Sequence, residues 1–233
     1  MTTPSPVRLD IQDLHFRHPG RLLWTGLNAS IGPGVTLVHG DDGCGKSTLL
    51  RLLAGALPLQ GGQLRLAGPD GEPAIDSALQ PQAWRERVFW VDPQGEVPAS
   101  VSAQPARIWL QSLAHSWPRF DDSMLAELTT GLKLDAHLDK AFYMLSTGTR
   151  RKVWLAGALA SGATVTLLDQ PFAALDRASI QLLLEVLQDA STHPTRAWVL
   201  ADAVAPPGVA LAGLIGALPE NGESHTPGGL SRS

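Results

Sequence analysis

The sequence has few of the features of secreted and membrane-spanning proteins. Its one cysteine, Cys44, excludes an internal disulfide framework and fits a reducing compartment. No apolar run reaches the roughly 18–20 residues that cross a bilayer. The first ten residues, MTTPSPVRLD, have no charged start followed by an apolar core, so no secretory signal is expected. The net charge of −4 is not the basic excess typical of nucleic-acid-binding proteins. We therefore expect a soluble, cytosolic chain that reaches a membrane only through a partner.

The periodicity of the apolar residues predicts an α/β protein. The 233 residues suffice for one large domain with a buried core, or a domain with a small insert. Period-two or short buried runs predict strands in 7–16, 35–38, 61–73, 88–92, 163–169 and 196–202, and a short strand after the turn at Pro19-Gly20. Spacings of three and four predict helices in 106–114, 122–132, 135–145, 149–160 and 177–190. Strands that alternate with helices indicate a largely parallel sheet. The helices in the middle form an expected insert, and the polar tail 220–233 is expected to be disordered.

Residues 40–48, GDDGCGKST, match the pattern G-x-x-x-x-G-K-S/T of a phosphate-binding loop. Glycines let backbone N–H groups turn toward phosphate oxygens, and the positive end of the following helix adds to that field. Lys46 can reach the outer phosphates, and the Ser47 hydroxyl can bind Mg²⁺. A buried strand precedes the loop and a helix follows it, which disfavours a chance match. The candidate nucleotide-binding residues are Gly40, Asp41, Asp42, Gly43, Cys44, Gly45, Lys46, Ser47 and Thr48.

Asp169 is the expected metal-binding carboxylate. It ends a buried apolar strand, where a carboxylate can hold Mg²⁺ through water. An aspartate in such a place can instead cap a helix or stabilise the structure. Together with the loop at 40–48, the magnesium role is favoured.

Residues 145–159, LSTGTRRKVWLAGAL, resemble the signature segment Leu-Ser-Gly-Gly-Gln of the ATP-binding-cassette (ABC) ATPases. Leu145, Ser146 and Gly148 match, whereas Thr147 and Thr149 depart from the first glycine and the glutamine. In that family the serine and glycine contact the γ-phosphate of ATP held by the other subunit. The resemblance therefore implies that Ser146 and Gly148 bind ATP across a dimer interface.

The order of the segments is also similar to that of the family, over about residues 7–219. Ala174-Leu175-Asp176 resembles the loop that crosses the dimer interface. Gln94 matches the glutamine that links the Mg²⁺ site to the helical subdomain, so it is a candidate for both nucleotide and metal binding. The implied fold is a P-loop NTPase: a RecA-like core with a mainly parallel sheet, an N-terminal antiparallel β edge and an inserted α-helical subdomain at about 95–160. We expect one domain over 1–219.

Three positions depart from the family. Gln170 stands at the general-base glutamate, Asp202 at the histidine that contacts the γ-phosphate, and His18 near the aromatic that stacks on adenine, two residues after Phe16. A glutamine can hold a water but cannot take its proton. An ionised Asp202 would repel the phosphate charge. The two changes predict ATP binding without efficient turnover. An engineered Gln170, which would trap bound ATP, is the alternative, but the second change favours natural degeneration.

The resemblance implies the ATP-binding subunit of a membrane transporter, with ATP and Mg²⁺ as cofactors. Its expected partners are a second ABC subunit, in a homo- or heterodimer, and an integral membrane permease. It would then be cytoplasmic and peripheral to the inner or plasma membrane. Two alternatives stay open: an ATP-gated module without a transport role, and the passive half of a heterodimer. The signature segment argues against a P-loop kinase outside the family.

Several other residues allow two interpretations. Cys44, near a helix N-terminus, can be a redox switch or simply a small residue that fits the loop. Trp109 and Trp117 can line a groove for the membrane subunit, but core packing is favoured. The basic run 150–152 is expected to be a solvated helix face, as are Asp121 and Asp122, which with Ser123 are also candidate N-caps.

Overall fold

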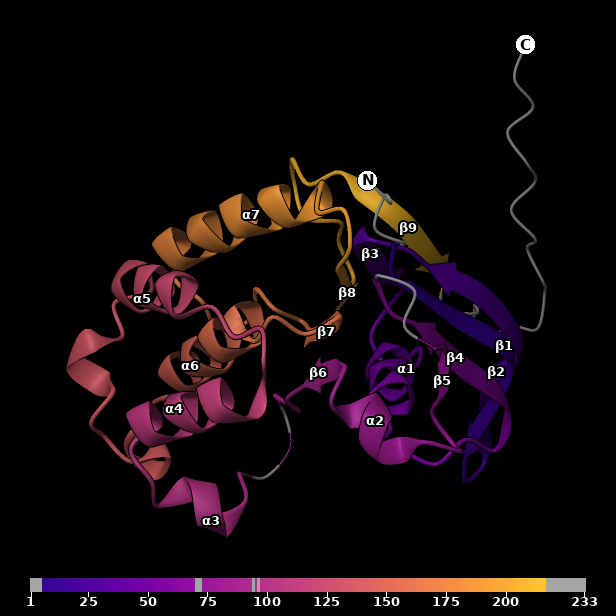
Figure 1. The fold of residues 1–233 in the computed structure, drawn as a ribbon, viewed down its shortest axis with the longest axis horizontal. Coiled ribbons are helices and arrows are strands. Elements are labelled where there is room, and N and C mark those ends of the chain that lie inside the picture. Colours follow the sequence, from indigo (N-terminus) through magenta and orange to yellow (C-terminus); the bar gives the residue numbers. More distant parts are fainter. Residues whose placement is uncertain (1–5, 70–72, 94, 96, 217–233) are drawn as a thin grey trace.

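Two sheets organise the chain in the computed structural model, which describes residues 6–69, 73–93, 95 and 97–216. An antiparallel sheet has the strand order β2-β1-β4-β5, and a parallel sheet has the order β6-β7-β8-β3-β9 (Figure 1). The antiparallel strands are β1 Arg8–His18, β2 Arg21–Ile31, β4 Gly61–Ala67 and β5 Ile75–Asp76. The parallel strands are β3 Gly34–His39, β6 Val88–Trp90, β7 Val165–Asp169, β8 Ala197–Asp202 and β9 Leu211–Gly216. The expected α/β fold with a mainly parallel sheet and N-terminal antiparallel strands is confirmed.

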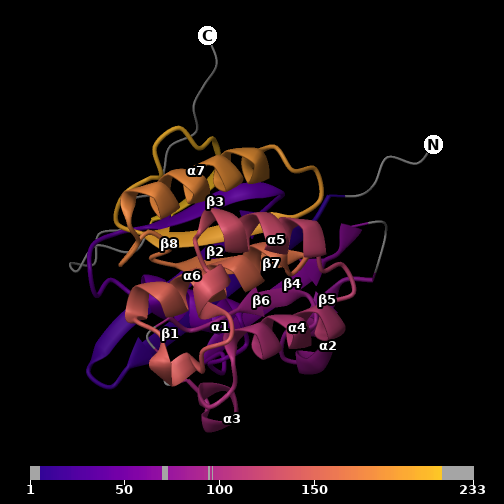
Figure 2. The same ribbon diagram turned by 90° about the vertical axis from the view of Figure 1, so that its left-hand side faces the viewer.

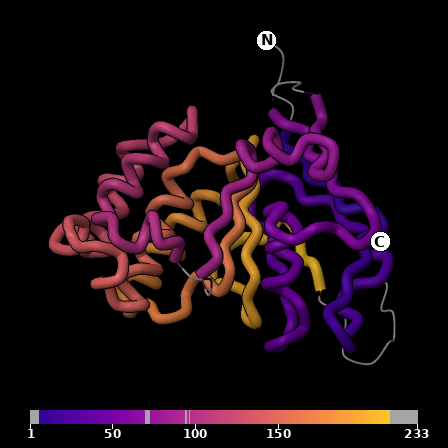
Figure 3. The backbone as a smooth tube through the Cα atoms, turned by 90° about the horizontal axis from the view of Figure 1, so that it is seen from below, coloured from indigo at the N-terminus to yellow at the C-terminus, as the bar shows by residue number. Residues whose placement is uncertain are grey.

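The burial of each strand follows from its place in the layers. Buried residues alternate with exposed or partly exposed ones over much of β1, because one face of the strand packs on the core and the other faces solvent. Every residue of β7 is buried, as expected for a parallel strand covered on both faces. The parallel sheet lies between the helical layer and the layer made by α1 and the antiparallel sheet (Figure 3).

Helix α1 packs on one face of the parallel sheet, and helices α6 and α7 pack on the other. The helices of the described residues are α1 Lys46–Leu53, α2 Pro81–Arg85, α3 Ala99–Ser102, α4 Ala106–Ser116, α5 Asp122–Gly131, α6 Thr147–Ala160 and α7 Arg177–Ser191. One core cluster joins Leu168 and Leu200 of the sheet to Leu155 of α6 and Leu187 of α7. Helices α5 and α7 lie side by side in both ribbon views (Figures 1 and 2). None of the helices in the described ranges is long and apolar enough to span a bilayer.

The helix expected over 135–145 is wrong. The segment forms two short 3-10 turns, η2 Asp135–His137 and η3 Phe142–Met144. The carbonyl oxygens of Leu138 and Lys140 accept hydrogen bonds from the backbone N–H groups of Arg107 and Ala106 at the start of α4. These carbonyls therefore serve the N-terminus of another helix instead of a helix of their own.

Other boundaries differ from the expectation in smaller ways. Strand β2 has 11 residues and is not short, because its pairing with β1 continues from Arg21 to Ile31. Strand β9, at the edge of the parallel sheet, was not predicted. The tail expected to be disordered, 220–233, lies outside the described residues. The limits of the single domain, 1–219, stay a prediction.

Candidate nucleotide-binding site

The loop before α1 lies at the carboxyl end of β3, and its glycines determine its course. Gly43 and Gly45 have φ values of 79° and 103°, which disfavour other residues. A Cβ on Gly45 would lie 3.2 Å from Trp24 Nε1, so a side chain there would also crowd the indole. Gly45 is the N-cap of α1, and its carbonyl accepts the first helical bond, from Leu49. The N–H groups of Lys46, Ser47 and Thr48 thus have no acceptor within the helix and are suited to bind an anion.

The buried side chain of Lys46 binds two backbone carbonyl groups of this loop. Its Nζ donates to the carbonyl oxygens of Gly40, at 2.6 Å, and Asp41, at 2.8 Å. The residue is only 5% exposed. Cys44 is half-buried, with Sγ 3.9 Å from Lys46 Nζ. Gly40, Asp41 and Cys44 therefore shape the loop and hold the ammonium group in place.

An open cleft of about 420 Å³ adjoins the loop. It is lined by His18, Arg21, Leu23, Asp42, Gly43, Gly45, Lys46, Ser47, Thr48 and Gln170. His18 Nε2 lies 3.3 Å from Thr48 Oγ1, and its ring meets that of Phe16 edge to face. The structure thus brings His18, the predicted adenine contact, to the same cleft as the phosphate loop and Gln170, which stands at the general-base position.

Asp169 lies beside Ser47, and together they fit a divalent cation. Asp169 is 6% exposed, and its Oδ1 has no hydrogen-bond partner among the described residues. Burial raises the pKa of this carboxyl, a hydrogen bond with Ser47 opposes the rise, and the nearby Asp92 adds to it. A cation would relieve both the burial penalty and the unpaired oxygen. Mg²⁺ typically takes one or two protein oxygens besides phosphates and water, and Ser47 and Asp169 can supply them.

Gln170 borders the cleft through an uncommon backbone conformation. Its φ is 44°, and its N–H donates to the carbonyl of Ala201 at 2.8 Å. The guanidinium of Arg151 donates to the carbonyl oxygens of Asp169, at 3.4 Å, and Gln170. Arg151 is buried, and its pKa is lowered by that burial. It stabilises the turn that carries both site residues.

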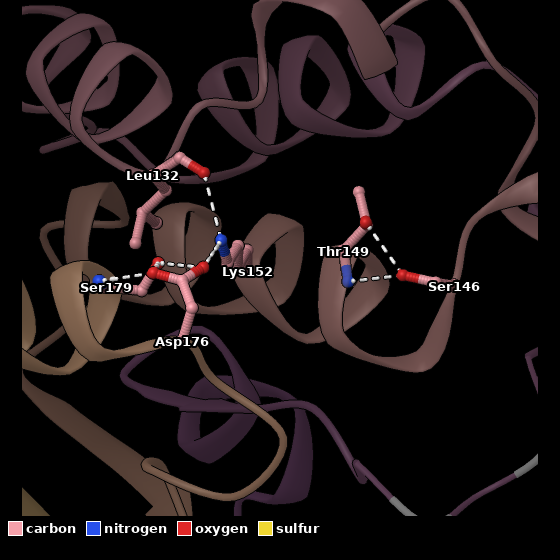
Figure 4. A network of polar contacts seen from close by, with 6 residues as sticks. All are labelled: Leu132, Ser146, Thr149, Lys152, Asp176 and Ser179. Atoms are coloured by element: carbon pink, nitrogen blue, oxygen red, sulfur yellow. Dashed lines mark hydrogen bonds and ion pairs between the residues drawn. The ribbon is translucent and has the colours of Figure 1, made fainter.

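The expectation that 150–152 is a solvated face is therefore wrong for two of its residues. Arg151 packs against the end of β7. Lys152 binds the carboxylate of Asp176 and the carbonyl of Leu132, the latter at 3.3 Å (Figure 4). Asp176 also caps α7 by accepting from Ser179 N at 3.0 Å. The hydrogen bond from Lys152 holds the pKa of Asp176 well below its usual range. These side chains connect α6 to the start of α7.

The signature-like segment begins α6. Ser146 is the N-cap, and its Oγ accepts from Thr149 N at 3.1 Å (Figure 4). A Cβ on Gly148 would lie 2.7 Å from the carbonyl oxygen of Ala174, so this position has room only for glycine. Ser146 is exposed, and neither it nor Gly148 lines the cleft of its own chain.

Asp202 does not line the cleft. Asp202 ends β8 opposite His39 of β3, and its Oδ1 accepts from Ala203 N at 2.7 Å. It borders a separate apolar pocket of about 200 Å³ with Val204 and Pro206. Gln94 lies outside the described residues, so its predicted role is not observed.

Some residues of the site were not predicted. Arg21 and Leu23 line the cleft because the β1–β2 hairpin pairs Arg21 with His18. The turn at Pro19-Gly20 was a signal that could have found Arg21. Asp92 pairs with Arg51 at 2.9 Å, and its place in the sequence predicts only the end of a strand.

Trp109, Trp117 and Asp121 have structural roles. Trp109 meets Phe142 edge to face, with ring centroids 5.7 Å apart, and Trp117 packs against Phe89 at 5.3 Å. Both tryptophans pack against the hydrophobic core, as the favoured interpretation of the sequence predicts. Asp121 caps α5 by accepting from Met124 N at 2.9 Å, which confirms one of the candidate N-caps.

Known proteins resemble the chain in sequence and in fold. Residues 25–173 match the family described as ABC transporter. The cytochrome c biogenesis ATP-binding export protein CcmA of Pseudomonas syringae is 30% identical over 191 residues, which cover 82% of this chain and 86% of that protein. CcmA of a Chelativorans species is 34% identical over 183 residues, covering 78% and 85%. A solved structure of an ATP-binding subunit of an ABC transporter superposes with a TM-score of 0.66 and 18% identity, covering 83% and 78%.

Proposed function

The chain belongs to the ABC transporter family of ATP-binding proteins, and we propose that it binds MgATP in a head-to-tail dimer, hydrolyses it slowly and drives a membrane permease. The observation that carries the proposal is the meeting of the phosphate loop, Ser47 with Asp169, and Gln170 around one cleft.

The cleft supplies the parts that ATP binding needs. The N–H groups at the start of α1 and the Lys46 ammonium provide positive charge for the phosphates. Ser47 and Asp169 would hold Mg²⁺, which neutralises charge on the phosphate oxygens when bound. His18, which lines the cleft beside Thr48, would contact the adenine.

The residues that would assist hydrolysis are weak. Gln170 can orient a water through its amide, but it cannot accept the proton at neutral pH. Asp202 stands in sequence where the family has a donor to the γ-phosphate, but an ionised carboxylate cannot donate, and Asp202 borders a different pocket. Loss of general-base assistance alone slows such a step by about 10²–10⁴-fold.

The exposed N-terminal end of α6 supports the proposed dimer. Ser146 and Thr147 are exposed, and the first N–H groups of a 14-residue helix lie beside them. These groups suit an anion and are not used by the cleft of the same chain. ATP held by one subunit would complete its site with the Ser146 segment of the other.

Light scattering of the purified chain tests the dimer. We expect a dimer with MgATP and a monomer with MgADP. Ser146→Arg should block dimerisation without weakening nucleotide binding, whereas Lys46→Ala should weaken binding itself. A chain that binds MgATP to saturation and stays monomeric contradicts the homodimer. Copurification with a membrane protein separates a transporter subunit from an ATP-gated module without a transport role.

A further inference from the structure

Another cavity, of about 130 Å³, lies at the opposite end of the parallel sheet from the nucleotide cleft. Met124 of α5, Leu159 of α6 and Val186 of α7 form apolar walls. The remaining wall comes from the start of β8, where Trp198 lies, whereas the nucleotide cleft adjoins the carboxyl ends of β3 and β7. The cavity is thus separate from the site described above.

Two buried donors at this cavity lack acceptors. Trp198 is 4% exposed, and its Nε1 has no hydrogen-bond partner within the described ranges. Nη2 of Arg196, another residue of the cavity wall, also has no hydrogen-bond partner among the described residues. Arg196 is fixed by its Nε, which donates to the carbonyl of Ala163 at 2.9 Å, and by its stacking 4.6 Å from the Trp198 ring. Since buried donors without partners are rare, the pair points to a ligand.

The charges around the cavity favour an anion. Arg119 lies near Arg196 and donates to Thr164 Oγ1 at 2.7 Å. Burial, and then Arg119, lowers the pKa of Arg196 to about 10, and Asp121 opposes this only in part. Asp189 is exposed at the cavity wall. Among the described residues no carboxylate forms an ion pair with Arg196, so no side chain neutralises its charge by direct contact.

His193 adds a third donor. Its Nδ1 accepts from the backbone N–H groups of Thr195, at 3.2 Å, and Arg196, at 3.1 Å. The proton of the neutral ring is therefore on Nε2. Burial lowers the pKa of His193, and Arg196 and Arg119 lower it further.

We propose that this cavity binds a small oxyanion, a carboxylate or phosphate group, through Arg196 Nη2 and Trp198 Nε1. Its volume is well above the roughly 10–15 Å³ that admits a single water molecule. Water could accept from the donors, but it would leave the guanidinium charge uncompensated. A cation would be repelled by Arg119 and Arg196. An oxyanion satisfies both donors and the charge at once.

The indole N–H resonances of the tryptophans test this site in the intact chain. Trp198→Phe identifies the Trp198 resonance and removes only its donor. Trp24 serves as an internal control, because its Nε1 lies against Gly45 of the phosphate loop and reports anions bound there. Sodium phosphate and sodium acetate are titrated separately at constant ionic strength.

We expect a saturable shift of the Trp198 resonance with at least one of the two anions. Arg196→Gln should weaken that response at least tenfold and leave the Trp24 response unchanged. The tighter anion identifies the ligand class as phosphate or carboxylate. If Arg196→Gln does not fold, saturation of Trp198 at acetate concentrations that do not move Trp24 supports the site. An unmoved or non-saturating Trp198 resonance, or a saturable shift unchanged in Arg196→Gln, overturns the proposal.

Discussion

At the scale of single residues, the environment of Asp169 disfavours the charge of an isolated carboxylate. It is buried, one of its oxygens has no partner among the described residues, and Asp92 lies nearby. The raised pKa means that the folded, metal-free chain carries this charge at a free-energy penalty near neutral pH. Binding of Mg²⁺ beside Ser47 would remove that penalty.

Asp169→Asn should therefore stabilise the metal-free protein while abolishing the effect of Mg²⁺. Because the folded-state pKa of Asp169 lies above its ordinary value of 3.8, the native state binds more protons than the unfolded state in the pH range between the two pKa values. The free energy of unfolding should therefore fall as pH rises through this range. Asp169→Asn should lack this fall and gain on the order of 1 kcal/mol at pH values above the range. Urea unfolding in EDTA at several pH values measures this. The exposed Asp122→Asn is the control, and a variant less stable than wild type at neutral pH contradicts the interpretation.

Among residues, those fixed by local pattern were predictable and those fixed by tertiary contact were not. The phosphate loop, Asp169 and Gln170 follow from short motifs, since the glycines and the strand end determine where they lie. The sequence predicts a surface position for Arg151, which is wrong because its burial depends on β7 passing beneath α6. The positions of Arg196 and Trp198 in a shared cavity depend on three helices at once.

At the scale of elements, the ends of helices are controlled by close backbone contacts. Gly162 follows α6 with a φ of 66°, and a Cβ there would lie 1.9 Å from the carbonyl oxygen of Arg119. This contact fixes α6 against the segment before α5. Asp121 N also donates to the carbonyl of Ala160 at 2.8 Å in the same place.

Gly162→Ala should destabilise the fold by at least about 2 kcal/mol, because both the left-handed conformation and the backbone overlap oppose a side chain. Gly32→Ala is the matched control. A Cβ on Gly32 meets nothing within 4 Å, and the expected change there is within about 0.5 kcal/mol. Urea unfolding followed by circular dichroism compares the two. Equal stabilities would show that the Arg119 contact is not rigid.

Most elements were predictable from periodicity, and the failures share a cause. The amphipathic helices and buried strands have strong local signals. The segment 135–145 has helical spacing too, but its carbonyls bind the start of α4. Strand β9 is stabilised by pairing with β3, a partner far away in the sequence.

At the scale of the whole molecule, the parallel sheet brings distant segments to one edge. The loop after β3 and the turn after β7 are more than a hundred residues apart in sequence, yet both border the nucleotide cleft. The antiparallel sheet adds His18 and Arg21 from the other side. On the proposed function, ATP binding would therefore depend on both sheets, and its hydrolysis on Gln170 after β7 and Asp202 at the end of β8.

The central claim is that this cleft binds MgATP firmly but hydrolyses it slowly because of Gln170 and Asp202. Single-turnover hydrolysis, with protein in excess over MgATP, tests it most directly in wild type, Gln170→Glu and the double variant Gln170→Glu, Asp202→His. We predict equal ATP binding in all three, a slow wild type, and a double variant faster by about 10²–10⁴-fold. A wild type that hydrolyses bound ATP as fast as the double variant would contradict the account.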